Sequence, residues 1–379
     1  MELFNTFLIG GYECADHINR SGERINLLKE TQHDIRVVED YEALAGIGIK
    51  TVREGICWSS VEIAPGVFDF SEVHNRMQAA EKFGIQQIWD LIHFGYPDGI
   101  YPTHPLFCKR FVELCEAFTL FYKKNTKEPL FVVPINEISF LSWHSGDVRG
   151  TVPFAVNSGW DIKYHLCKAA ILGIKMLKNT NPECRIILVE PLVKIHASEL
   201  QPDVHELNEN QFQAMDIIGG RMCPELGGSD ELLDILGFNY YWNCQWKANG
   251  EPLDWPDPEH KRMPFSALLQ TAYERYNKPV FISETGHFGS GRVEWLEEIT
   301  SECLLAKKNG VDLRGLCIYP VTDRPDWDDL TKYCQCGIWD LDENGNRIPH
   351  QEYIDAVIKA QNDLSKKKTI LNQLIDFFK

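Results

Sequence analysis

Two apolar stretches that each end in a glutamate decide the expected fold of this chain: FVVPINE at residues 131–137 and VFISETG at residues 280–286. Each has the length and composition of a β-strand that is buried on both faces. Each also places an ionisable carboxyl, Glu137 or Glu284, where the apolar run gives way to a loop. Because a buried charge is costly, a carboxylate at such a position indicates a functional site.

Apolar runs of this kind recur along the chain and alternate with segments of helical periodicity. The predicted strands are Phe7–Gly11, Thr51–Cys57, Gln87–His93, Leu130–Ile135, Arg185–Val189, Ile235–Tyr241, Pro279–Ser283 and Gly315–Pro320. The predicted helices are Asp34–Ala45, Glu72–Phe83 with Ser71 as its N-cap, Phe107–Lys124, Tyr164–Asn179, Phe265–Tyr276, Val293–Asn309 and Gln351–Asp363. This alternation predicts an α/β fold, a single-domain (β/α)8 TIM barrel over residues 1–363.

The main alternative is a doubly wound open sheet, which usually carries a glycine-rich phosphate loop after its first strand. The corresponding segment, YECADHINRSGER at residues 12–24, lacks that pattern, which favours the barrel. Residues 243–262 are rich in Pro, Trp and Asp and predict a long loop near the active face. Residues 364–379 predict a C-terminal amphipathic helical tail that packs on the barrel or docks on a partner.

The chain has 379 residues and a formal net charge of −17, which argues against nucleic-acid and anionic-membrane partners. We see no signal-peptide pattern, and no apolar run approaches the about 18 residues that span a bilayer. The twelve cysteines then predict reduced thiols and a cytoplasmic location. Cys334 and Cys336 lie close in sequence, but no second pair has zinc-ligand spacing, so neither a metal nor a cofactor is expected.

The active site of such a barrel lies at the C-terminal ends of its strands, where this chain concentrates polar side chains. They are Asp16, His17, Arg53, Glu54, Trp58, Asp90, His93, Asn136, Glu137, Glu190, Asn239, Tyr240, Tyr241, Glu284, Tyr319, Asp323, Asp326 and Trp327. Two carboxyls that face one sugar ring are the machinery of glycoside hydrolysis. On position alone, Glu190 is as good a candidate for such a pair as Glu137 or Glu284.

Six segments, one for each of six strand ends and in the right order, resemble motifs of the clan A glycoside hydrolases, and most nearly the family 1 β-glycosidases. They are TVREGICWSSVEIAPGVFDF (51–70), DLIHFGYPDGI (90–100), PINEIS (134–139), ILGFNYYWN (235–243), FISETG (281–286) and VTDRPDW (321–327). The resemblance extends discontinuously over about residues 8–342. It implies that Glu137 is the acid/base and Glu284 the nucleophile. It also implies substrate-binding roles for Arg53, Trp58, His93, Asn136, Asn239, Tyr241, Tyr319, Asp326 and Trp327.

The chain departs from the family pattern at the sugar-binding positions. The family's strand-one glutamine has no clear match, so Asp16 or His17 is expected in its place. Tyr319 stands where the family has a tryptophan, and Asp326 where it has a glutamate. The chain is also shorter than typical members. These departures bear on the identity of the sugar more than on the chemistry.

The resemblance implies a retaining β-glycosidase that acts on small β-glycosides by double displacement, with the two carboxyls about 5–5.5 Å apart. A transglycosidase would use the same residues. A phospho-sugar substrate is a further alternative, because Lys332 and Tyr333 follow the strand-eight loop. A barrel that has lost activity and serves as a carbohydrate-binding or scaffolding protein is the alternative from another class. A homo-oligomer is compatible with each of these.

Overall fold

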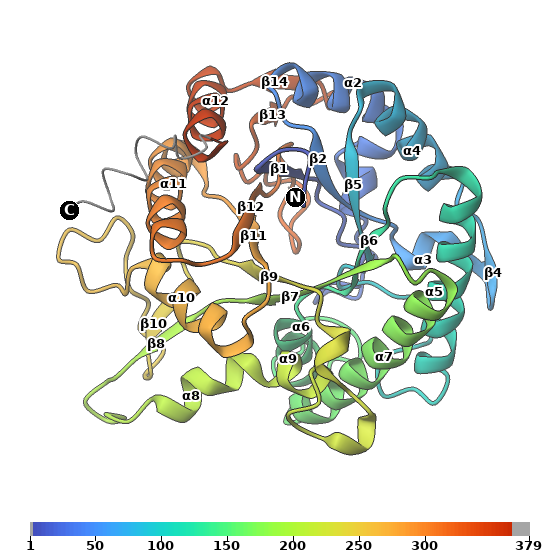
Figure 1. Ribbon diagram of the computed structural model, residues 1–379, viewed down its shortest axis with the longest axis horizontal. Helices are drawn as coiled ribbons and strands as arrows, with labels where there is room; N and C mark the ends of the chain where they lie inside the picture. Colours follow the sequence, from blue (N-terminus) through green and yellow to red (C-terminus); the bar gives the residue numbers. More distant parts are fainter. Residues whose placement is uncertain (1–2, 366–379) are drawn as a thin grey trace.

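The computed structural model of the protein describes residues 3–365. Eight parallel strands close into a barrel in the order β1-β2-β5-β6-β7-β9-β11-β12, with β12 paired back to β1 (Figure 1). These strands are β1 (Leu8–Gly11), β2 (Thr51–Gly55), β5 (Gln86–Ile92), β6 (Phe131–Ile135), β7 (Arg185–Pro191), β9 (Ile235–Asn239), β11 (Val280–Thr285) and β12 (Leu313–Ile318). The predicted single-domain (β/α)8 barrel is therefore confirmed.

Helices surround the barrel and connect its strands (Figure 1). The longer ones are α2 (His33–Gly46), α4 (Ser71–Phe83), α5 (Phe107–Asn125), α6 (Ile138–Gly146), α7 (Gly159–Thr180), α10 (Phe265–Tyr276), α11 (Arg292–Lys308) and α12 (Gln351–Ser365). The short elements are α1 (Leu27–Glu30), α3 (Trp58–Val61), α8 (His205–Glu209), α9 (Gln213–Ile218) and the strand pairs β3 (Glu62–Ala64) with β4 (Val67–Phe68), β8 (Lys194–His196) with β10 (Gln245–Lys247), and β13 (Trp339–Leu341) with β14 (Arg347–Pro349).

The structure corrects the sequence-based boundaries in a few places. Ser71 is the first residue of α4 rather than its N-cap, and its backbone N–H donates to the side chain of Asp69 at 2.9 Å. The segment 243–262, predicted to be a loop, contains the short strand β10. Helix α12 continues to Ser365, two residues beyond the predicted end at Asp363, and Leu364 is buried. The rest of the predicted tail lies outside the described residues.

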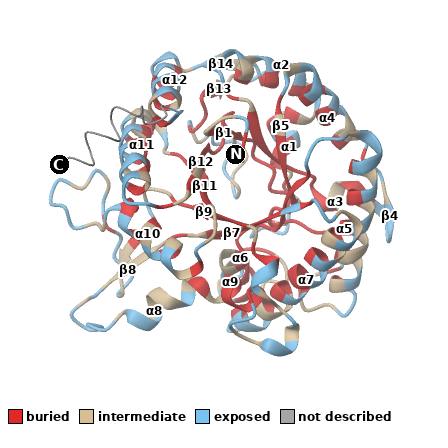
Figure 2. Ribbon diagram, in the orientation of Figure 1, coloured by how far each residue is buried: buried red, intermediate tan, exposed pale blue. Residues whose placement is uncertain are grey.

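The apolar core has two layers, and this explains why the barrel strands read as continuous apolar runs. One cluster of side chains fills the barrel interior and includes Ile9, Phe131, Val133 and Phe281, with Phe4 packed among them. A larger cluster lies between the barrel and the helices. Figure 2 shows buried residues concentrated in the barrel strands and on the inward faces of the helices. Within residues 3–365, no helix is long and apolar enough to cross a membrane.

Strand β2 carries two adjacent charged residues that point in opposite directions, as the pleat requires. Arg53 faces the barrel interior, whereas Glu54 faces the helix layer. There the Glu54 carboxylate accepts hydrogen bonds from Tyr41 Oη (2.6 Å), His33 Nε2 (2.8 Å) and Arg76 Nη1 (2.7 Å). Burial raises the pKa of Glu54, but the charges of His33 and Arg76 outweigh it and lower the pKa to about 2.

Glu54→Gln is expected to destabilise the protein by about 3–5 kcal/mol, because it leaves the Arg76 guanidinium buried without its carboxylate. Since the folded pKa is depressed, the stabilisation by Glu54 is fully present above its unfolded pKa of about 4.3 and is lost as the pH falls towards 2. Urea unfolding at pH 7 and at pH 3 measures both effects. Glu72→Gln, in a surface pair with Lys29, is the matched control and should change stability by less than about 1 kcal/mol.

Candidate active site

Arg53 organises the polar residues at the C-terminal mouth of the barrel. Its Nε and Nη2 bind the two oxygens of Asp90 at 3.0 and 2.6 Å, and Nη1 binds the carbonyl of Ser283 at 3.0 Å and Glu284 Oε1 at 2.7 Å. Nη2 also donates to Asn136 Oδ1 at 2.7 Å. All five N–H groups of the guanidinium are thus used, which fixes these side chains relative to one another.

Glu284 lies inside β11, close to its end, and is held by two donors from different elements. Arg53 binds Oε1, and the hydroxyl of Tyr241, in the loop after β9, donates to Oε2 at 2.8 Å. The two donors fix the orientation of the Glu284 carboxylate within the site. Two of the predicted substrate-binding residues, Arg53 and Tyr241, therefore contact Glu284 directly.

Glu137 follows β6 directly and is fixed through a chain of amide contacts. Ser283 Oγ donates to Asn239 Oδ1 at 2.6 Å, which orients the Asn239 amide so that Nδ2 donates to Glu137 Oε1 at 2.8 Å. Because Oε1 is an acceptor in this contact, the proton of a neutral Glu137 resides on Oε2. The Glu137 backbone has a φ of +46°, a conformation unusual for a residue with a side chain.

The two carboxyls have different surroundings, as an acid and a nucleophile require. Burial raises the pKa of Glu137 well above its usual range, and the nearby charge of Glu284 raises it further. The hydrogen bond from Asn239 opposes this shift but does not cancel it. The raised pKa favours the protonated form of Glu137, whereas Glu284 is bound by the donors Arg53 and Tyr241.

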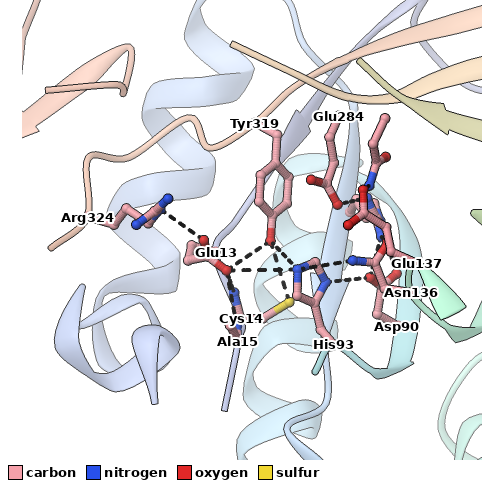
Figure 3. A network of polar contacts seen from close by, with 12 residues as sticks. Glu13, Cys14, Ala15, Asp90, His93, Asn136, Glu137, Glu284, Tyr319 and Arg324 are labelled. Atoms are coloured by element: carbon pink, nitrogen blue, oxygen red, sulfur yellow. Dashed lines mark hydrogen bonds and ion pairs between the residues drawn. The ribbon is translucent and has the colours of Figure 1, made fainter. Parts of the chain in front are cut away.

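His93 and Asn136 form the next part of the network (Figure 3). His93 Nδ1 contacts Asp90 Oδ2 at 2.8 Å, which leaves Nε2 facing Asn136 Nδ2 at 3.4 Å and Tyr319 Oη at 3.2 Å. Burial lowers the pKa of His93, but the hydrogen bond to Asp90 and the charge of Asp90 raise it above its ordinary value. The structure thus places two predicted sugar-binding residues, His93 and Asn136, next to each other.

Glu13, just beyond β1, is the residue of this network that we did not predict from the sequence. Its Oε1 accepts from the backbone N–H groups of Cys14 and Ala15, both at 3.1 Å, and from Tyr319 Oη at 3.3 Å (Figure 3). Its Oε2 lies 3.0 Å from Arg324 Nε. Burial raises the pKa of Glu13, but Arg324, His93 and the two N–H groups together lower it below its usual value.

Glu13 contacts Tyr319 and His93, whereas the predicted alternatives Asp16 and His17 have other neighbours. Asp16 is turned away and accepts from the Ser59 backbone N–H at 3.1 Å. Glu13 could have been found in the sequence, because it is a carboxylate directly after a buried strand, like Glu137 and Glu284.

Arg324, not Asp326, is the residue of the strand-eight loop that enters the network, which corrects the prediction for Asp326. The Asp326 side chain is exposed and accepts from the backbone N–H groups of Asp328 (2.9 Å) and Asp329 (3.2 Å). It therefore closes a turn in its own loop. The Arg324 side chain is mostly buried and pairs with Glu13.

Aromatic rings from four segments meet at the rim of the site. The Trp327 ring lies 4.5 Å from that of His17 and 5.2 Å from that of Phe94, and Phe140 and His144 of α6 lie 6.3 Å away. Within the described chain, Trp327 Nε1 and His17 Nδ1 are buried atoms without a hydrogen-bond partner. His17 and Phe94 also line a pocket of about 250 Å³ that neither Glu137 nor Glu284 lines.

The prediction that Trp58 faces the sugar is wrong. Trp58 begins α3 and is fully buried in the layer between the barrel and the helices. Its Nε1–H donates to Glu62 Oε2 at 2.6 Å, and its ring packs on Phe107 and Phe111. Tyr319, by contrast, lies in the network, with its ring parallel to His93 at 5.7 Å.

Glu190, the third candidate carboxylate, contacts the first turn of helix α6, which follows Glu137. It is buried within β7, and its two oxygens accept from the Ser139 backbone N–H at 3.2 and 3.1 Å. Since Ser139 lies in the first turn of α6, this contact anchors the helix that starts immediately after Glu137. Burial raises the pKa of Glu190 to about 7.

Glu190→Gln is expected to move the alkaline limb of the kcat/KM profile to lower pH. The ionised Glu190 raises the pKa of Glu137, so a neutral amide lets Glu137 lose its proton at lower pH. The amide oxygen still accepts from Ser139, so stability should fall by no more than about 1 kcal/mol. An unchanged profile in the folded variant would show that Glu190 has no electrostatic effect on Glu137.

Cys14, Asp90 and His93 form a group whose donor atoms all lie within 4.8 Å of one another. They do not suit a metal ion, because the ring nitrogen Nδ1 of His93 already contacts Asp90 Oδ2 at 2.8 Å. Asp90 also already binds the Arg53 guanidinium at 2.6 Å, and that charge would repel a cation. We therefore assign these residues to the hydrogen-bond network.

Comparisons with known proteins give distant relatives and similar folds. No family model matches the chain. It is 23% identical over 321 residues to an aryl-phospho-beta-D-glucosidase, BglH of Bacillus subtilis, covering 69% of this chain and 67% of that protein. It is 24% identical over 315 residues to a 6-phospho-beta-glucosidase, AscB of Escherichia coli, covering 66% and 64%. The matched part is thus about two thirds of each relative.

Solved structures of a family 1 β-glucosidase from Thermotoga maritima are similar over nearly the whole chain. One, in complex with glucoimidazole, has a TM-score of 0.76 at 16% identity and covers 95% of this chain and 99% of that one. Another has a TM-score of 0.76 at 15% identity and covers 97% and 100%. The resemblance to family 1 β-glycosidases is therefore confirmed, and at these identities the structural likeness establishes the fold.

Proposed function

We propose that this protein is a retaining β-glycosidase that hydrolyses small β-glycosides. The observation that carries the proposal is the pair of buried carboxyls at one mouth of the barrel, Glu137 and Glu284, linked through Arg53 and Asn136 and held in unlike environments. In the retaining mechanism, Glu284 attacks the anomeric carbon while Glu137 gives the proton on Oε2 to the leaving oxygen. Glu137 then takes a proton from the water that releases the sugar.

The remaining residues of the network supply hydrogen bonds to sugar hydroxyls. Since Asn136 Oδ1 is occupied by Arg53, its Nδ2 is the group that can donate to the hydroxyl next to the anomeric carbon. Glu13 is an acceptor, and Trp327 Nε1 is a donor without a protein partner among the described residues. These groups bind a neutral ring that presents several hydroxyls, and no cofactor is required for the chemistry.

The leaving group belongs on the side of α6, because this helix follows directly after the proposed acid Glu137. Its Phe140 stacks on His144 at 5.2 Å, and the neighbouring Trp143 is 48% exposed. Apolar faces of this kind favour an aromatic or otherwise apolar aglycone. A sugar acceptor on the same surface would give transglycosylation with the same residues.

Labelling with 2-fluoro glycosides tests the nucleophile and the sugar together. A 2-deoxy-2-fluoro β-glycoside with an activated leaving group is expected to inactivate the enzyme and to leave its sugar on the peptide that contains Glu284. Gluco, galacto and manno configurations are compared in parallel, and the fastest inactivator identifies the preferred sugar. A label on Glu137 or Glu190 would contradict the assignment. Binding of glycosides without labelling or turnover would favour the inactive, carbohydrate-binding alternative.

A phosphorylated sugar is the second candidate substrate, because both curated relatives are named as phospho-glucosidases. The residues proposed for the phosphate are Lys332 and Tyr333, both exposed after the strand-eight loop, where Lys332 Nζ pairs with Asp329 at 2.7 Å. The ratio of kcat/KM for an aryl β-glucoside and its 6-phosphate decides between them. If the phosphate is preferred, Lys332→Ala should remove the preference without changing the rate on the neutral glucoside.

A further inference from the structure

The loop after β12 holds two cysteines beside the network but outside the proposed chemistry. Cys334 and Cys336 are separated by Gln335, whose backbone has a φ of +54°. The Cys334 backbone N–H donates to the Arg324 carbonyl at 3.0 Å, and that of Cys336 donates to Asp323 Oδ1 at 3.1 Å. Both ends of the short segment are thus tied to the same strand-eight loop.

Cys334 differs from the other cysteines of the chain in its surroundings. Arg324 Nη1 lies 3.6 Å from Cys334 Sγ, and the side chain is partly exposed. The neighbouring Cys336 and the charge of Arg324 both lower the pKa of Cys334. Two other partly exposed cysteines, Cys108 and Cys223, have pKa values raised by burial. A thiolate that is accessible and paired with a cation is the reactive form of cysteine.

Cys336 has the position of a second, resolving thiol. It is buried, and its Sγ donates to Asp323 Oδ1 at 3.3 Å. Its pKa is raised well above the usual value, first because of the neighbouring Cys334 and then because of burial. A partly exposed thiol beside a cation is thus followed two residues later by a buried thiol that donates to a carboxylate, as in reactive dithiol sites.

We propose that Cys334 and Cys336 form an oxidation site in which Cys334 is the attacking thiolate and Cys336 resolves its product as a disulfide. The oxidant is a peroxide. The Cys334 thiolate attacks one oxygen of hydrogen peroxide, the O–O bond breaks, and the products are a sulfenic acid and, after proton uptake, water. The Cys336 sulfur then attacks the Cys334 sulfur and releases the hydroxyl as a second water. Two thiols lose two electrons and two protons, and one peroxide takes them up.

Oxidation of Cys334 would affect the hydrogen-bond network at the barrel mouth through Arg324. Arg324 binds Cys334 through Nη1 and lies beside Glu13 through Nε, so the loss of the thiolate removes one of the two negative partners of this guanidinium. Glu13 in turn contacts Tyr319 and His93. The oxidation site itself does not depend on the proposed glycosidase activity.

Peptide mass analysis of the intact, folded protein tests this proposal directly. Trypsin cleavage after Lys332 and Arg347 leaves residues 333–347, which contain these two cysteines and no others. After brief treatment with hydrogen peroxide at pH 7 and alkylation in denaturant, this peptide is expected to be unalkylated and two hydrogens lighter. Cys108 serves as an internal control and should be alkylated fully. Without peroxide, Cys334 should react with iodoacetamide at least about tenfold faster than Cys108.

Two variants separate the roles of the thiols. Cys336→Ser should stop the reaction at the sulfenic acid, which dimedone traps on Cys334. Cys334→Ser should leave Cys336 reduced. Thermal melts establish that both variants are folded. The proposal is overturned if residues 333–347 stay in the dithiol form while Cys108 or Cys223 is oxidised, or if folded Cys336→Ser gives no dimedone adduct. Equal iodoacetamide rates for Cys334 and Cys108 would also overturn it.

Discussion

Glu284→Gln is expected to lower kcat/KM on an aryl β-glycoside by on the order of 10⁴-fold or more, because an amide cannot form the covalent glycosyl intermediate. The fold should survive, since the amide oxygen can still accept from Arg53 Nη1 or Tyr241 Oη. Steady-state kinetics together with a thermal melt measure both outcomes. Glu206→Gln, on the exposed helix α8, is the matched control and should be unchanged in both.

A smaller side chain at the same position gives a more specific readout. In Glu284→Gly, the space left by the carboxylate can admit a small anion such as azide to the face that Glu284 attacks. Azide is then expected to restore turnover of an activated β-glycoside and to give the α-glycosyl azide. Restored turnover with a β-configured product, or a rate in Glu284→Gln equal to that of the wild type, would contradict the assignment of the nucleophile.

Glu137→Gln is expected to cost about 10²–10⁴-fold in kcat/KM for a substrate whose leaving group needs a proton. For a dinitrophenyl glycoside the first step needs no proton, so the loss should fall on the later hydrolysis and appear in kcat. The pH profile should change as well. Because the pKa of Glu137 is raised, the wild-type kcat/KM falls as the pH rises through it, and this alkaline limb should vanish in the variant. Equal losses for both leaving groups would exclude Glu137 as the acid.

The barrel could be predicted from the sequence, because strand period is a local signal. Strand-end polarity gave three candidate carboxyls, and the resemblance to family motifs selected Glu137 and Glu284 among them. Side-chain direction is not local. Glu190 has the same strand-end pattern as Glu137, yet its carboxylate is taken by the first turn of α6. Trp58 follows soon after β2 ends at Gly55, yet its ring turns into the helix layer instead of the barrel mouth.

The strand-eight loop is a second case in which the sequence pattern did not predict side-chain direction. Arg324 and Asp326 are two residues apart, and the sequence pattern favoured Asp326. In the structure, Asp326 accepts the backbone N–H groups of Asp328 and Asp329, and this turn directs Arg324 towards Glu13. Such a turn depends on the geometry of its own loop, which strand periodicity does not report. Glu13 was missed for a different reason, since Asp16 and His17 of the same segment were the residues predicted for the site.

The complete use of the Arg53 guanidinium has a consequence for how specificity can change in this fold. Because every N–H of Arg53 is already bonded, its side chain cannot move to contact a ligand. The residues bound to Arg53 therefore keep their positions and need little reorganisation during a reaction. New substrates must therefore be accommodated by the rim, where Trp327, His17 and the α6 aromatics lie on loops and helix ends. The residues bound to Arg53 are thus fixed in position, whereas the aromatic residues at the rim can change to accommodate a different substrate.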